Sequence, residues 1–226
     1  YGTIDENNLN DYLSVGYIAG LSDRYAAYYS ASDYAKRQQE DAGKLVGIGI
    51  RASKSESGFI QVNEVYPDSP AEDAQIKAGD LIVKVNDIDV TADTYESAIT
   101  EIGGQAGTKL SLTVRSDNKD REIAEITRRV VVTPTIYSHM IGTTGYVKIT
   151  DFNENTYDQF KKALENLVGN QGAQSLIFDL RNNTGGLVDP AIKMLDMLLP
   201  EGVIATATYR DGSTEVLGNS DANCID

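Results

Sequence analysis

The sequence predicts an α+β protein of several domains: helices at the N-terminus, a small β-sandwich with two helices, and the first part of an α/β layered domain. Three observations support this. Residues 5–42 carry apolar side chains at helical spacing. Residues 46–115 form short apolar runs separated by tight turns, and residues 145–209 alternate strand, helix, strand, helix and strand. The predicted domain boundaries are 1–43, 44–117 and 118–226.

The composition is that of a folded protein with an acidic surface. Hydrophobic residues make up 41% of the 226 residues, which is enough for real cores. The 34 acidic residues outnumber the 20 basic ones, which gives a net charge of −14. Because a surface this negative repels nucleic acid and no basic stripe offsets it, we expect no nucleic-acid partner.

Metal, disulfide and histidine chemistry find little support in the sequence. Cys224 is the single cysteine, so no internal disulfide can form, and no Cys/His cluster has metal-ligand spacing. His139 is the single histidine, and no nucleophile motif accompanies it, so we interpret it as an ordinary strand or loop residue.

No apolar run is long enough for a membrane-spanning helix, and no signal peptide is visible. Because the chain opens at Tyr1, we expect it to be a piece of a longer protein.

The first segment is predicted to contain two helices, one from its apolar periodicity and one from its N-terminal cap. Ser30 followed by Asp33 resembles a capping box for the second helix, which Gly43 can end. The first helix shows its periodic face at Leu9, Tyr12, Leu13, Gly16 and Tyr17.

The β domain combines short strands with two helices. The first helix begins at Ser69, where Pro70 occupies the first turn and Glu72 the third position. The predicted strands are 46–51, 59–65, 81–85 and 109–115. The second helix has one apolar face made of Tyr95, Ala98, Ile99 and Ile102.

The third segment is predicted to alternate between strands and amphipathic helices. The run 175–180 is continuously apolar, which predicts a strand buried on both faces. Asp211-Gly212 predicts a hairpin. The other predicted strands are 121–133, 145–149 and 203–209, and the helices are 157–168 and 188–199, the latter with Val188, Ala191, Ile192, Leu195, Leu198 and Leu199 facing inward.

A glycine-rich turn is the first candidate site. Gly47-Ile48-Gly49-Ile50 can aim several backbone N–H groups at one anion, although a tight turn without a ligand is the commoner role of such a pattern. Beside a free strand edge and an apolar helix, the turn could hold the carboxylate of a peptide that adds to the sheet.

The order of motifs around this turn resembles a PDZ domain of the circularly permuted type found in bacterial proteases. The most specific part runs from Ser69-Pro70-Ala71 to Ala78-Gly79-Asp80-Leu81-Ile82. The resemblance implies that Gly47, Ile48, Gly49 and Ile50 capture a peptide carboxylate and backbone. It also implies that Tyr95, Ala98, Ile99 and Ile102 line the side-chain pocket.

A diglycine loop is the second candidate site. The strand 175–180 leads through Asn183, Thr184, Gly185 and Gly186 into a helix. Backbone N–H groups at such a helix start carry positive potential and can form an oxyanion hole, although a tight strand-to-helix connection is the simpler interpretation.

This loop is similar to the "DLRxNxGG" signature of the carboxyl-terminal processing (tail-specific) serine peptidases, with Thr184 in place of the usual proline. Leu21-Ser22-Asp23-Arg24-Tyr25 also resembles a family motif. The resemblance implies a crotonase/ClpP-like peptidase domain, Gly185 and Gly186 as oxyanion-hole candidates, and a Ser/Lys dyad without metal or organic cofactor. The segments that would hold the serine and lysine come later than Asp226, so we expect this chain alone to be inactive.

Other interpretations remain open. Ser116 and Lys119 fit S-x-x-K, but they lie in a polar stretch between two strands and predict an exposed hairpin turn. A non-catalytic PDZ sensor with a degenerate peptidase-like domain is the main alternative, and a structural scaffold a weaker one. The resemblance further implies protein or peptide partners with free C-termini and an extracytoplasmic location, at the periplasm or outer cell surface. We also expect an exposed apolar edge around 203–217 and possible homo-oligomers.

Overall fold

The computed structural model describes residues 6–221, 223 and 224, and these divide into two compact units with the boundary between Glu40 and Asp41. The first unit contains α1 (Glu6–Gly20) and most of α2 (Ala31–Asp41), which confirms the two predicted helices. The N-terminus of α2 is capped as predicted, because the Ser30 hydroxyl accepts the N–H of Asp33 at 3.2 Å and donates to its carboxylate at 2.7 Å.

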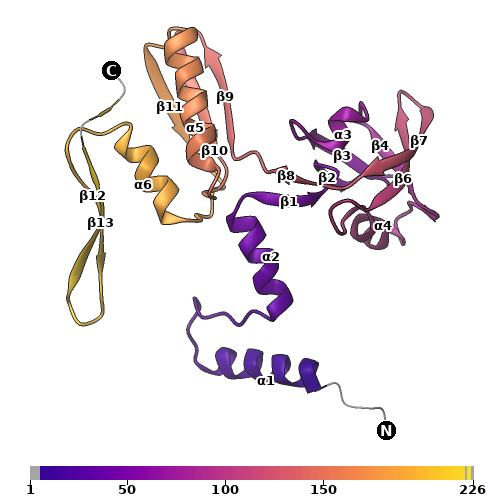
Figure 1. Ribbon diagram of the computed structural model, residues 1–226, viewed down its shortest axis with the longest axis horizontal. Coiled ribbons are helices and arrows are strands. Elements are labelled where there is room, and N and C mark those ends of the chain that lie inside the picture. The colour runs from indigo at the N-terminus through magenta and orange to yellow at the C-terminus, as the bar shows by residue number, and fades with distance from the viewer. Residues whose placement is uncertain (1–5, 222, 225–226) are drawn as a thin grey trace. The chain divides into compact units, whose positions relative to one another are not determined.

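The β domain forms the first half of the second unit and is built on one antiparallel sheet (Figure 1). The order of its strands is β2-β3-β4-β6-β7, with β5 paired to β4 alone. Its core gathers aliphatic side chains from every strand of the sheet, from the buried Ile60 and Ile82 to Leu112 and Ile126. The strands are β2 (Ile50–Lys54), β3 (Ile60–Val65), β4 (Leu81–Val85), β5 (Ile88–Asp89), β6 (Lys109–Ser116) and β7 (Lys119–Thr127), and the helices are α3 (Pro70–Asp73) and α4 (Tyr95–Ile102).

Two of the predicted strands are each divided in the structure. The run 46–51 splits into β1 (Lys44–Gly47) and β2, because Gly49 adopts a positive φ of 78° between them. The run 121–133 splits into β7 and β8 (Arg129–Val132) at Arg128, whose side chain turns inward and is buried. β1 and β8 then pair as a separate antiparallel ribbon.

The α/β part contains a three-stranded sheet in the order β11-β10-β9 (Figure 1). β10 (Thr144–Ile149) pairs parallel with β11 (Ser175–Asp179) and antiparallel with β9 (Ile136–Ile141), a strand that the sequence patterns did not indicate. One face of the sheet packs on α5 (Thr156–Leu164) and the π-helical turn that follows it, Glu165–Asn170. The core of this part is Val147, Ile149, Phe160, Leu164, Leu167 and Met194.

The prediction that 175–180 is buried on both faces is wrong. β11 is the edge strand of its sheet, so Ile177 is 49% and Leu180 50% exposed. The inward face predicted for the next helix also fails in part: α6 (Val188–Asp196) buries Pro190 and Met194, whereas Val188 is exposed. A continuous apolar run indicates that a strand can be buried on both faces. Among the described residues, however, no second layer covers this face of the sheet.

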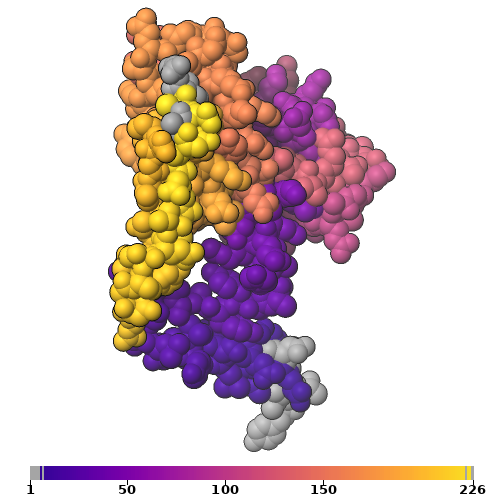
Figure 2. Space-filling view, turned by 60° about the vertical axis from the view of Figure 1, so that its left-hand side comes forward, coloured from indigo at the N-terminus to yellow at the C-terminus, as the bar shows by residue number. Residues whose placement is uncertain are grey.

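β12 (Gly202–Thr208) and β13 (Thr214–Ser220) form the predicted hairpin around Gly212. Val203, Val216 and Leu217 are exposed on it, which confirms the expected apolar surface. Figure 2 shows the hairpin, in yellow, on the face turned toward the viewer.

Candidate peptide-binding edge and diglycine loop

The 47–50 turn joins β1 to β2 and presents free backbone donors. A Cβ on Gly49 would lie 2.3 Å from the Ser69 Cβ, so this position requires glycine. The carbonyl of Ile48 accepts the Ala71 N–H at 2.8 Å, and the carbonyl of Gly49 accepts the Tyr66 N–H at 2.9 Å. With both carbonyls held inside the domain, no described residue accepts a hydrogen bond from the N–H of Ile48 or Gly49. These two donors are available to an anion.

The strand that follows the turn has an open edge. β2 is the first strand of the sheet order, and its Ile50 lies opposite Val65. Because Tyr66 N bonds to the Gly49 carbonyl, Ile50 and Val65 form a non-hydrogen-bonded pair. The N–H and C=O of Ile50 therefore point to the free side of β2, where an added strand would meet them.

An apolar pocket of about 260 Å³ opens beside this edge. No charged residue lines it, and its walls come from β1, the 47–50 turn, β2 and the C-terminal end of α4. The structure thus brings the predicted turn together with Ile99 and Ile102. The lining residues are Leu45, Val46, Gly47, Ile48, Gly49, Ile50, Ala52, Ile99, Ile102 and Gly103.

The other two residues predicted for this pocket lie elsewhere on α4. Ala98 is completely buried in the domain core, and Tyr95 begins the helix, with its ring 5.2 Å from the Lys54 amine. Neither residue is part of the pocket lining. Sequence reasoning missed Leu45 and Val46, because only the β1–β8 ribbon places β1 beside α4.

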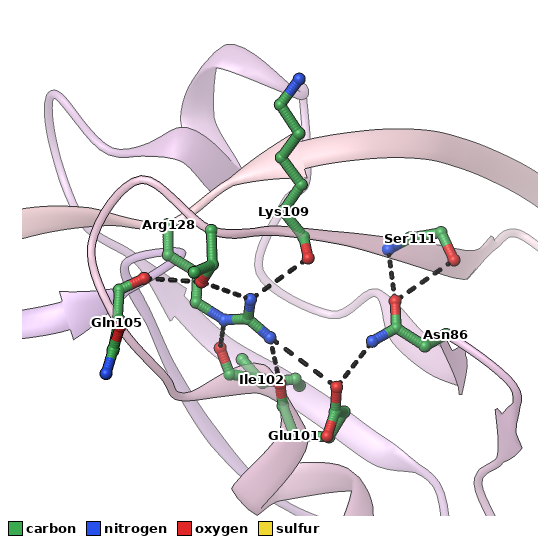
Figure 3. Close-up of polar contacts among 8 residues, drawn as sticks. Asn86, Glu101, Ile102, Gln105, Lys109, Ser111 and Arg128 are labelled. Carbon is green, nitrogen blue, oxygen red and sulfur yellow. Dashed lines mark hydrogen bonds and ion pairs between the residues drawn. The ribbon is translucent and has the colours of Figure 1, made fainter.

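Arg128 fixes the C-terminal end of α4, which forms one wall of the pocket (Figure 3). Its side chain is 6% exposed, and the guanidinium donates to the carbonyls of Ile102 at 3.1 Å and Glu101 at 2.6 Å. It also donates to the Thr108 hydroxyl and the Lys109 carbonyl on β6. A cation at the end of a helix satisfies carbonyls that have no partner within the helix. Arg128 is therefore a positioning residue for the pocket.

The diglycine loop follows β11 and packs against the segment after β10. Phe152 donates its N–H to the Gly185 carbonyl at 3.2 Å, and the Phe152 carbonyl accepts the Leu187 N–H at 2.7 Å. These two bonds form a parallel bridge between Phe152 and Gly186. The Asn183 side chain accepts the Gly185 N–H at 2.7 Å. No described residue accepts a hydrogen bond from Gly186, which is exposed.

The strand end before the loop is held by a charged cluster. Asp179 is buried, and its two oxygens accept hydrogen bonds from Arg181 at 2.9 and 2.7 Å. The Tyr146 hydroxyl donates to the same carboxylate. The Arg181 guanidinium, and after it the Tyr146 hydroxyl, hold the pKa of Asp179 well below its usual range. The rings of His139 and Tyr146 contact each other in a tilted arrangement, with centroids 4.9 Å apart.

We expect the Arg181→Gln variant to raise the pKa of Asp179 toward that of an ordinary carboxyl group, because the largest cause of the depression is removed. A depressed folded-state pKa means that the stabilisation is present above the ordinary carboxyl pKa and is lost as pH falls through the folded value. In the parent chain the cluster should therefore persist below the ordinary carboxyl range. Carbon-detected NMR titration of Asp179 checks this, with Arg210→Gln as a charge-matched control. An unchanged pKa in Arg181→Gln would contradict the assignment.

We expect Gly186→Ala to destabilise the α/β part more than Gly185→Ala does, by about 2 kcal/mol. Both glycines have positive φ, 116° at Gly185 and 133° at Gly186, so both alanines carry backbone strain. Only at Gly186 does the new Cβ meet backbone, 2.2 Å from the Phe152 carbonyl oxygen, whereas nothing lies within 4 Å at Gly185. Urea unfolding of the two variants measures the difference, and equal losses would show that the bridge is not formed.

The described residues contain no other arrangement typical of a catalytic centre. Asp117 and Asn118 adopt positive φ in the tight turn between β6 and β7, so the S-x-x-K match at Ser116 and Lys119 is a hairpin turn, as predicted. The Ser116 hydroxyl donates to Asp80. Across the described part of the chain, no three His, Cys, Asp or Glu residues gather as a metal site, and no helix is long and apolar enough to cross a bilayer.

Comparison with known families gives two matches. Residues 61–116 match the PDZ domain model, and residues 143–223, which include the diglycine loop, match the model of peptidase family S41. The PDZ match begins after the 47–50 turn.

Curated relatives match nearly the whole chain. The carboxy-terminal processing protease CtpA of Bacillus subtilis is 31% identical over 219 residues, which cover 96% of this chain and 47% of that protein. A probable CtpA-like serine protease of Staphylococcus epidermidis is 30% identical over 187 residues, covering 83% of this chain and 38% of that protein. The chain thus spans less than half the length of these relatives.

Two solved structures also align with parts of the chain. The photosystem II D1 C-terminal processing protease aligns with 99% of this chain and 62% of its own, at 23% identity and a TM-score of 0.46. The PDZ domain of a carboxy-terminal protease from Vibrio cholerae, in complex with peptide, aligns with 39% of this chain and 97% of its own, at 22% identity and a TM-score of 0.34. From these comparisons, residues 61–116 match a PDZ domain and residues 143–223 match peptidase family S41, and the chain is similar over nearly its whole length to carboxy-terminal processing proteases.

Proposed function

We propose that this chain captures the C-terminal tail of a protein substrate on the edge of β2, as the recognition part of a carboxyl-terminal processing endopeptidase. The observation that carries the proposal is the meeting of three features at one place: free N–H groups at Ile48 and Gly49, the open edge at Ile50, and the uncharged pocket. Free N–H groups can bind a terminal carboxylate, and an open strand edge can pair with an extended backbone. The uncharged pocket can hold an apolar last side chain.

The geometry also supports one direction for the bound peptide. A tail that pairs antiparallel with β2 places its carboxylate at the 47–50 turn and its last side chain between Ile50, Ile99 and Ile102. Arg128 keeps α4 in position to receive that side chain. A pocket of about 260 Å³ without charges favours aliphatic over charged side chains.

For the chemical step we propose Gly186 as the oxyanion-hole donor of this chain. The N–H of Gly185 is occupied by Asn183, whereas the bridge to Phe152 leaves the N–H of Gly186 directed away from that segment. The family resemblance supports a serine nucleophile and a lysine base lying beyond this chain, so that the chain alone is inactive. It also supports an extracytoplasmic location.

The Ile99→Asp variant tests the peptide site. We expect its affinity for a peptide with an apolar C-terminal residue to fall at least about tenfold, because the new carboxylate lies in the pocket and close to that of the ligand. Thr100→Asp is the matched control: it adds the same charge one residue later on α4, where the side chain is exposed. Fluorescence anisotropy with a labelled peptide measures both. Equal affinities in the two variants would place the peptide elsewhere.

A further inference from the structure

A second cleft lies between the PDZ sheet and the β9–β11 sheet. It has a volume of about 450 Å³ and is lined by Arg51 and Tyr66 on one side and by Tyr137, Lys148 and Asp151 on the other. Arg51 directly follows Ile50 on β2, but it faces away from the apolar pocket, which is lined by Ile50 and Ala52. The cleft is therefore separate from the site proposed for the peptide carboxylate.

Hydrogen-bond donors without partners converge on this cleft. No described residue accepts a hydrogen bond from the Lys148 amine or from the Tyr66 hydroxyl. Arg51 uses only its Nε, which donates to Glu64 at 3.0 Å, so its two terminal nitrogens have no acceptor among the described residues. Arg51 is 61% exposed, which keeps these nitrogens accessible. A planar guanidinium with free terminal nitrogens binds a carboxylate well.

The acidic groups nearby leave these donors without an acceptor, although Glu64 forms an ion pair with Arg51. The Glu64 carboxylate is already shared by Arg51 and by Tyr137, whose hydroxyl donates to it at 3.1 Å. Asp151 accepts the N–H of Phe152 at 2.8 Å. In a chain with a net charge of −14, a cleft in which two cations keep free donors is a local exception.

The cleft also adjoins the diglycine loop. Asp151 leads into Phe152, whose backbone bonds to Gly185 and Leu187 on the two sides of Gly186. A peptide that crosses the Gly186 N–H would therefore pass beside Asp151, which lines the cleft together with Lys148.

We propose that this cleft is a subsite for an acidic side chain of the substrate, bound by Lys148 and Arg51. This rests on the proposed function, since it assumes a peptide ligand, but it uses residues that the C-terminal recognition site does not. The carboxylate ligand is a Glu or Asp side chain within the peptide rather than its C-terminus.

The test uses one eight-residue sequence in four forms: glutamate or glutamine at an internal position, each with a free or an amidated C-terminus. Binding to the whole chain is followed by amide NMR at low salt. We expect the amidated glutamate peptide to shift the amides of Arg51, Lys148 and Thr150, and to bind about fivefold more tightly than its glutamine form. Lys148→Gln should remove this preference, and added salt should weaken it. Lys161→Gln is the matched control, because Lys161 is exposed on α5, at the opposite face of the sheet.

Equal binding of the glutamate and glutamine peptides, or a glutamate preference that survives in Lys148→Gln, would overturn the subsite. The free-acid glutamine peptide reports on the 47–50 turn alone, and its binding should be the same in Lys148→Gln as in the parent chain. Failure of the subsite and failure of carboxylate capture therefore give different results.

Discussion

Replacing Gly49 by valine should destabilise the PDZ domain by about 4 kcal/mol and abolish peptide binding. Two costs add at this position. A β-branched residue at a φ of 78° carries backbone strain of about 1–3 kcal/mol. The new Cβ would also lie 2.3 Å from the Ser69 Cβ and 3.2 Å from a Val131 methyl group, so the turn has to move away from α3 and β8. Moving the turn redirects the N–H groups of Ile48 and Gly49.

Gly47 provides the control for this prediction within the same turn. It has no positive φ, and nothing lies within 4 Å of a Cβ built on it. Gly47→Val should therefore cost less than about 1 kcal/mol in the free energy of unfolding. Urea unfolding followed by circular dichroism measures both variants. Similar losses at the two positions would mean that the turn is not held in the conformation described.

Local sequence signals predicted most helices and strands of the PDZ domain. The Ser69 cap, the apolar face of α4 and the alternation in β6 are each decided by residues within about one turn or strand of one another. The structure confirms the cap, since the Ser69 hydroxyl accepts the Glu72 N–H at 3.2 Å. The hairpin turn at Asp117 and Asn118 could be predicted for the same reason, because residues close in sequence determine it.

The errors came where distant contacts decide the structure. Arg128 interrupts the run 121–133 because it reaches the end of α4, about 26 residues earlier in the chain, and no local pattern shows this. In the α/β part, the apolar run 175–180 correctly predicted a strand. Its exposure depends on which neighbours the sheet has, and that is a property of the sheet rather than of the run.

The candidate site also combines features that local sequence predicts with features that depend on distant contacts. Its glycine turn and two of the predicted α4 residues, Ile99 and Ile102, were visible in the sequence. The wall formed by Leu45 and Val46 depends on the pairing of β1 with β8, and the second cleft depends on the approach of β9 to β3. The choice between Gly185 and Gly186 required the Asn183 hydrogen bond.

Amidation of the peptide C-terminus should be the change to the ligand that weakens binding most. An amide removes the negative charge and adds an N–H₂ group facing the N–H donors of Ile48 and Gly49. Hydrogen bonds to a charged acceptor contribute about 1.5–3 kcal/mol each. The loss of one such contact corresponds to an affinity decrease of about 30-fold.

The most direct test of carboxylate capture is the dissociation constant of one apolar-ended peptide, measured for its free acid and its amide with this chain. The account predicts that the free acid binds at least about 30-fold more tightly and shifts the amide signals of Ile48, Gly49 and Ile50. Equal binding of the two forms, or binding of the free acid without those shifts, would contradict it.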